Sequence, residues 1–330
     1  MKNRRSIFRN FAGKRTRTVL NSRPFSLPLL VLAATLLLLM GPASLFAQMP
    51  GHLEPVDNLK FSVSAAPLYQ FKSDVNGGGD FSVTRYFLSA NGSAPISDRL
   101  RLGVGLTYEF EDYDFSSLSG FTVPNPWNRV DRVGLGARLM YKVGENWNIL
   151  AGPLVQYAGE QGADFDKSLM YGGIIAASYR ASRNFAIGFG AGVFYRLEET
   201  RVFPALIVSW KITDRLRLGN SYRVGPAGPA GLELGYMLDE SWELAVGGGY
   251  RSLRFRLDKD GPVPGGIGEN NNWPVYVRLG GKLARNINLD VYVGAAFGGK
   301  LELEDRHGND INSVSYNTAP MVGFTLSASF

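Results

Sequence analysis

Apolar and polar side chains alternate along most of the chain from residue 58 onward. Between residues 100 and 110 the even positions are apolar or aromatic, and the odd positions are arginine, glycine, threonine or glutamate. A period of two predicts β-strands with one apolar and one polar face. The alternating runs are about 10–13 residues long, which exceeds the usual strand of a soluble sandwich and suits a tilted membrane-spanning strand.

Six short polar segments of similar composition join these runs in pairs. Each places about two to four polar residues between apolar ones, which is typical of the turn of a tight β-hairpin. The connections at the opposite ends of the runs are longer, variable and rich in glycine and asparagine. Short turns at one end and long loops at the other predict a transmembrane antiparallel up-and-down β-barrel. The six segments occupy residues 96–102, 143–149, 181–187, 212–218, 238–244 and 283–289.

The hairpins supply twelve strands, and one further run at each end gives about 14. Twelve is the alternative, because residues 81–95 alternate poorly and residues 59–72 also fit a periplasmic position. An even number places both termini at the end of the short turns. In the eleventh strand the lipid-facing set changes after residue 250 to Leu253, Phe255 and Leu257, which predicts a β-bulge near Ser252. The predicted strands are 58–72, 81–95, 99–112, 130–143, 147–158, 169–181, 184–197, 202–213, 215–224, 230–238, 242–258, 274–284, 286–304 and 317–330.

The first 47 residues have the order of a secretory signal peptide. They hold eight basic and no acidic residues, followed by an apolar run at 27–40 and small residues before Ala47. The apolar run is 14 residues long, whereas a spanning helix needs about 20. We therefore predict a cleaved signal peptide at 1–47, a short periplasmic tail at 48–57 and a barrel at 58–330, located in the bacterial outer membrane.

Removal of this segment changes the net charge of the protein. The chain has 35 Lys and Arg against 29 Asp and Glu, for a formal charge of +6. Without the eight basic residues, 27 remain against 29 acidic ones, for a charge of −2. The sequence therefore gives no reason to expect a nucleic-acid partner. Cysteine is absent, which excludes disulfides and thiolate metal sites, and we predict no cofactor.

The carboxyl end alternates to a terminal aromatic residue, with Phe324, Leu326 and Phe330 on one face. This pattern resembles the C-terminal assembly signal of bacterial outer-membrane β-barrels. The layout from residue 59 to residue 330 is similar to that of uncharacterised families of such proteins. The resemblance implies the barrel-assembly machinery as a partner, besides outer-membrane lipid, and leaves a homo-oligomer open.

On the predicted register, basic side chains outnumber acidic ones on the inner face. Fixed positive charge in a confined pore concentrates anions, so we predict a passive, porin-like channel for small polar or anionic solutes. Alternatively, the arginines pair with the acids and close the lumen. The predicted pore-lining residues are Arg138, Arg180, Arg196, Arg223, Arg251, Arg278, Glu109, Glu233, Glu243 and Asp290.

Two other functions are alternatives to a channel. A structural or adhesive surface barrel would act through its loops, which are short and polar here. A barrel-embedded lipid-modifying enzyme would need a histidine or an acid pair beside a nucleophile. The chain has two histidines, His52 in the tail and His307 in a polar loop, and neither lies in a catalytic pattern. We therefore predict no enzymatic activity and no metal site. The loops at 113–129 and 259–273 fit either an inward constriction or an outward projection.

Overall fold

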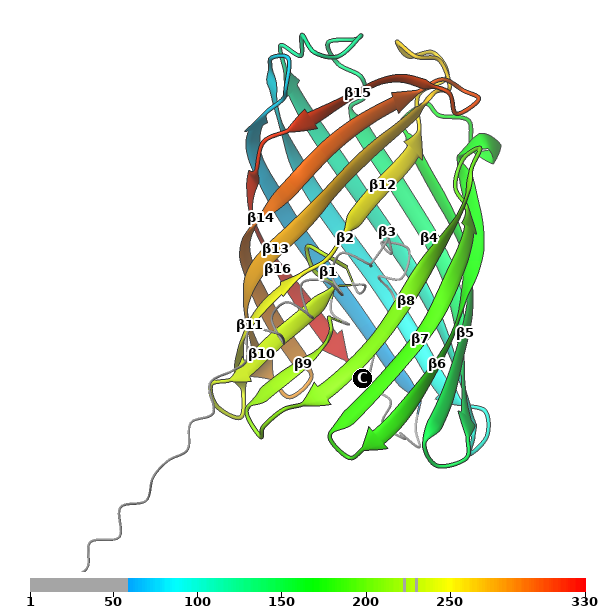
Figure 1. Ribbon diagram of the computed structural model, residues 1–330, viewed down its shortest axis with the longest axis vertical. Coiled ribbons are helices and arrows are strands. Elements are labelled where there is room, and N and C mark those ends of the chain that lie inside the picture. The colour runs from blue at the N-terminus through cyan, green and yellow to red at the C-terminus, as the bar shows by residue number, and fades with distance from the viewer. Residues whose placement is uncertain (1–58, 222–223, 229–230) are drawn as a thin grey trace, which may run out of the picture. The chain divides into compact units, whose positions relative to one another are not determined.

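The computed structural model describes residues 59–221, 224–228 and 231–330. The predicted signal peptide and tail, residues 1–47 and 48–57, lie outside these described residues. The described residues form one closed β-sheet, in which most strands pair antiparallel with their neighbours along the chain (Figure 1). The strands are β1 (Lys60–Asp74), β2 (Asp80–Pro95), β3 (Leu100–Ser116), β4 (Arg129–Val143), β5 (Trp147–Glu160), β6 (Leu169–Ser182), β7 (Phe185–Tyr195), β8 (Thr200–Lys211), β9 (Leu216–Asn220), β10 (Leu232–Met237), β11 (Trp242–Gly248), β12 (Arg251–Arg256), β13 (Ile267–Ala284), β14 (Ile287–Glu304), β15 (Asp310–Tyr316) and β16 (Ala319–Ser329).

The 16 strands form a barrel wall of 14 strands. β11 and β12 together make one interrupted wall strand, and β15 and β16 make another. β11 and β12 pair in succession with β13, and β15 and β16 pair in succession with β14. The barrel closes where β1 pairs with β16, from Ser62 opposite Ser329 to Gln70 opposite Met321. The prediction of 14 strands is confirmed. Six short turns lie at one end, here called the turn end, and the longer connections lie at the other, the loop end (Figure 1).

Alternation along the strands separates an outer apolar face from the lumen, as predicted. In β3, Val104 and Leu106 are about half exposed on the outer surface, whereas Thr107 and Glu109 are buried inside. A sheet whose outer face is apolar and whose inner face carries charge is the arrangement of a transmembrane barrel. The described residues therefore have the architecture of an outer-membrane β-barrel.

The lumen is filled at its loop end by apolar side chains, here called the loop-end cluster. Trp127 is buried at its centre, in edge-to-face contact with Phe255 and Phe121, with ring centroids 5.2 and 6.0 Å apart. Leu118 and Phe121 come from the β3–β4 connection. That connection therefore folds inward, which decides between the two arrangements that the sequence allowed for residues 113–129.

β12 joins this cluster, which corrects two predictions. The pairing of β11 and β12 with β13 keeps one register across residues 249 and 250, so no β-bulge lies near Ser252. Leu253 and Phe255, predicted to face lipid, are almost fully buried in the loop-end cluster. The reason is that β12 leaves the wall: its last residue, Arg256, pairs with Gly159 of β5. The predicted loop at 259–273 is also shorter than expected, because β13 begins at Ile267.

The barrel wall is interrupted beside β8. β9 and β10 are short and stay near the turn end (Figure 1). β8 pairs with β9 only over Ser209–Lys211, so its remaining edge has no neighbouring strand among the described residues. Asn220 covers part of this edge, since its side chain accepts from Val208 N–H at 2.8 Å and donates to Leu206 C=O at 3.1 Å. Pro204, two residues further on, has no N–H to leave unpaired.

Replacing Asn220 with alanine should destabilise the barrel. Two backbone groups of the free β8 edge would lose their partner in an apolar environment, where each unpaired group costs about 1–3 kcal/mol. The urea midpoint of unfolding in detergent micelles, followed by the heat-modifiable gel mobility of the barrel, should therefore fall. Asn146→Ala, in an exposed short turn, should keep the wild-type midpoint. Equal midpoints for the two variants would contradict the capping role of Asn220.

Candidate lumen binding site

Most of the predicted pore-lining charges lie inside the lumen, but they are paired. At the turn end, Arg278 is fully buried. It donates to Glu233 at 3.0 Å, to Glu243 at 2.8 Å and to Asp290 at 2.9 Å. Glu243 also pairs with Arg217. We call these five residues the turn-end network. Two arginines here face three carboxylates, so the network carries an excess of one negative charge.

Glycines on the inner face make room for these pairs. A Cβ atom on Gly280 would lie 2.1 Å from Arg278 Nη1 and 2.2 Å from Asp290 Oδ1. A Cβ atom on Gly235 would lie 2.2 Å from Glu243 Oε1. The ion pairs therefore lie directly over the glycine backbone. At these positions the missing side chain lets the charged network pack against the wall.

A second set of pairs anchors β12 beneath the loop-end cluster. Arg254 donates to both carboxylate oxygens of Glu304 at 2.6 Å and to Glu269 at 3.0 Å. It also donates to the backbone carbonyls of Arg196 and Leu197, at 3.0 and 3.1 Å. Leu197 has a φ of +51°, in a strained connection between β7 and β8. The guanidinium of Arg254 thus links β12 to the β7–β8 connection.

The third set lies midway along the lumen and is here called the guanidinium cluster. It consists of Arg85 of β2, Glu109 and Glu111 of β3, Arg132 of β4 and Arg251 of β12, all buried. Arg251 Nη2 donates to Glu109 Oε1 at 3.0 Å and bonds Glu111, which also bonds Arg85. Arg132 lies 3.3 Å from Glu109. Three arginines against two carboxylates leave one positive charge in excess.

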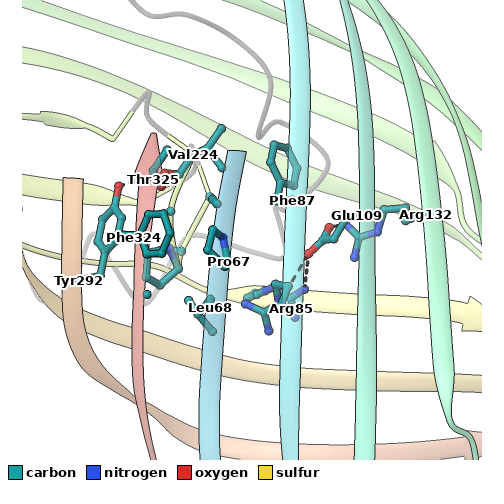
Figure 2. A pocket seen from close by; sticks show the side chains of 17 residues that line it. Pro67, Leu68, Arg85, Phe87, Glu109, Arg132, Val224, Tyr292, Phe324 and Thr325 are labelled. Carbon is teal, nitrogen blue, oxygen red and sulfur yellow. Dashed lines mark hydrogen bonds and ion pairs between the residues drawn. The ribbon is translucent and has the colours of Figure 1, made fainter. Parts of the chain in front are cut away.

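A cavity lies against this cluster. Figure 2 shows Arg85, Glu109 and Arg132 along one side, with Leu68 of β1 and Tyr292 of β14 on the other. The connection between β9 and β10 supplies another side, because Val224 C=O accepts from Tyr292 Oη at 2.9 Å and from Thr325 Oγ1 at 2.8 Å. Residues 224–228 of this connection therefore line the cavity on the inside of the barrel. The cavity thus has a charged side and a largely apolar remainder, which suits a solute of mixed character.

The remaining predicted residues are placed as follows. Arg196 is buried, Arg138 is half-buried beside Gly103, and Arg180 is exposed near the turn end. Arg223 lies outside the described residues. The residues of the predicted assembly signal, Phe324, Leu326 and Phe330, are exposed on the outer face.

Several residues of the site were not among the predicted ones. Arg85 was missed because the alternation of its strand is poor, although it lies directly opposite Glu111 in the β2–β3 pairing. Arg132 alternated correctly but was left out of the predicted set. Its position opposite Glu109 in the β3–β4 pairing was the available signal, because buried charges are expected to be paired.

The loop around His307 is built as a turn. Asp305 accepts from the side chain of Asn309 at 2.8 Å and from two backbone N–H groups, and these bonds lower the pKa of Asp305 to about 2. His307 is exposed beside Arg306. In the part of the chain that the structure describes, no cluster of His, Asp or Glu side chains forms a metal site. No helix there is long and apolar enough to cross a membrane.

Residues 96–329 match the model of the family described as Domain of unknown function (DUF6268). The chain belongs to this DUF6268 family. The match covers the barrel from the β2–β3 turn to the end of β16, including the guanidinium cluster apart from Arg85. A search of curated proteins finds no match.

The DUF6268 barrel is similar in fold to solved outer-membrane proteins at low sequence identity. The COG4313 outer membrane channel from Pseudomonas putida F1 shares 13% identity at a TM-score of 0.49, over 86% of this chain and 99% of that one. A FadL homologue from Pseudomonas aeruginosa shares 14% at 0.40, over 82% and 89%. The KdgM porin shares 11% at 0.33, over 81% and 99%. These similarities concern the fold alone.

A Cβ atom at position 280 should disrupt the turn-end network. Gly280→Ala would push Arg278 away from Asp290, and breaking a buried ion pair costs about 3–5 kcal/mol. The urea midpoint of the barrel should fall markedly. Gly92→Ala is the matched control, because a Cβ atom there meets nothing within 4 Å. If G280A were as stable as G92A, the pair would not depend on the glycine.

Proposed function

We propose that the protein is a passive outer-membrane channel for small polar or anionic solutes, in particular organic anions. The observation that carries the proposal is the guanidinium cluster, whose excess positive charge borders a cavity midway along the lumen. Positive charge in a confined, poorly solvated passage favours anions. Pairing with Glu109 and Glu111 reduces this charge without cancelling it.

The route that we propose leaves the lumen beside β8 and not through the loop end. The loop-end cluster fills the lumen there, with Trp127, Leu253 and Phe255 buried to 2% exposure or less. Below it, the inner faces of β5 to β8 are mostly apolar, with Leu154, Ile174, Phe194 and Phe203 buried and the polar Gln156 and Ser178 between them. This apolar side of the lumen adjoins the interrupted wall. A solute with a charged group and an apolar body fits both surfaces.

The second candidate is a surface barrel that conducts nothing. The loop-end cluster and the paired arginines favour it, because both reduce the open cross-section of the lumen. The two candidates differ in whether solutes pass from one side of a membrane to the other.

The proposal predicts ion conduction by protein purified from the membranes of expressing bacteria and inserted into a planar bilayer. Stable conductance steps are expected, with reversal potentials that favour the anion under gradients of KCl and of potassium propionate. Ala205→Trp, on the lumen face of β8 opposite Gly190, should reduce propionate conductance by roughly half or more.

The control for this variant is Ala151→Trp, which adds the same side chain to the outer face of β5 and should leave conductance unchanged. Electrical silence from correctly inserted wild-type protein would favour the surface barrel. Conduction that is insensitive to A205W would place the route elsewhere in the lumen.

A further inference from the structure

The guanidinium cluster holds buried donors that the protein does not satisfy. Within the described residues, Arg132 Nε and Nη2 and Arg251 Nη1 have no hydrogen-bond partner. The two residues are 7% and 5% exposed. An unpaired polar group in a buried site costs about 1–3 kcal/mol, and more when it is charged. A group from outside the chain is therefore needed to complete the cluster.

The chemistry of these donors indicates what that group is. A guanidinium presents its N–H groups in a planar fork that matches the two oxygens of a carboxylate. The cluster already pairs with two carboxylates, those of Glu109 and Glu111, through contacts that each use a single guanidinium nitrogen. Three arginines against two glutamates leave one negative charge to be supplied. A third carboxylate would bring the cluster to neutrality and would accept from the unpaired N–H groups.

The rest of the cavity sets the character and size of the ligand. Ala66, Leu68, Val224 and Ala227 line it opposite the arginines, so the lining away from the cluster is largely apolar. The space holds only a few water molecules, which limits the ligand to a short chain. A small monocarboxylate with an apolar body of a few carbons fits this combination better than a sugar or an inorganic polyanion.

We propose that this cavity is a binding site for a small organic carboxylate, held by Arg132 and Arg251. The site deepens the proposed channel function, because it names the class of solute that pauses midway along the lumen. Arg85 is a positioning residue: its guanidinium is occupied by Glu111, and it thereby orients the carboxylate that also binds Arg251. Glu109 borders the same cavity and opposes the incoming anion.

Calorimetric titration of the purified protein in detergent with propionate tests the site directly. Propionate should bind, and propionamide, its neutral counterpart, should not. Arg132→Gln should weaken propionate binding at least about tenfold, as expected from the loss of a charged donor. Glu109→Gln should strengthen binding, because it raises the excess charge of the cluster. Opposite effects of two changes in one cluster cannot both come from misfolding.

The matched control is Arg138→Gln, on the same strand and inner face as Arg132 but nearer the turn end. It should bind propionate as the wild type does. Equal binding of propionate and propionamide, or wild-type affinity in R132Q, would overturn the proposal. Conductance of the same samples separates this site from the channel: binding without conduction supports the site and refutes the channel, and conduction without binding does the reverse.

Discussion

The structure depends on one constraint, which is that backbone N–H and C=O groups must be paired inside an apolar phase. Closure between β1 and β16 satisfies it around most of the wall. At the free edge of β8, where the neighbouring strands end early, Asn220 and Pro204 meet the same constraint by other means. The side-chain amide of Asn220 bonds backbone groups that a neighbouring strand would otherwise bond, and Pro204 has no N–H that needs a partner. An interruption of the wall is thus accommodated without exposing unpaired N–H groups at these positions.

A second constraint governs the lumen, where charge is buried on a scale that only pairing can stabilise. Removal of an arginine or a glutamate from water costs several kcal/mol, and the loss is recovered only where hydrogen bonds are nearly complete. Arg278 and Arg254 are each surrounded by acceptors. Arg132 is not, although it is also buried. The complete sets of acceptors around Arg278 and Arg254 are typical of structural ion pairs, whereas the unpaired donors of Arg132 support the proposed binding site.

Alternation along the strands was sufficient to predict the barrel and its 14 strands. Glu109 lies on the inner face, as its place in the uninterrupted alternation of β3 indicates. Alternation shows which side chains share a face of a strand, but not whether that face contacts lipid or other side chains. This explains the wrong predictions for β12. Leu253 and Phe255 alternate like lipid-facing residues, but their apolar surroundings are other side chains. Whether an apolar row meets lipid or a protein core depends on where the neighbouring strand ends.

The pairings that form the candidate site could not be predicted from local pattern. Arg251 Nη2 binds Glu109 and Glu111 across the lumen, about 140 residues earlier in the chain, and only barrel closure brings them together. Arg85 was hidden because β2 alternates irregularly. Cross-strand pairing of opposite charges would have revealed it, because Arg85 faces Glu111 and Arg132 faces Glu109 once the hairpin register is known.

In the proposed anion site, the two glutamates of the guanidinium cluster would set how strongly the anion is held. Three unopposed arginines in a confined lumen would bind an anion too tightly for release, whereas a passive channel needs a site that is easy to leave. Glu109 and Glu111 reduce the excess from three charges to one. On the turn-end side, the network around Arg278 has an excess of one negative charge. In the proposed channel this charge would repel an anion that has left the guanidinium cluster. Weak attraction at the guanidinium cluster, next to weak repulsion at the turn-end network, is the charge arrangement that favours passage of an anion over its retention.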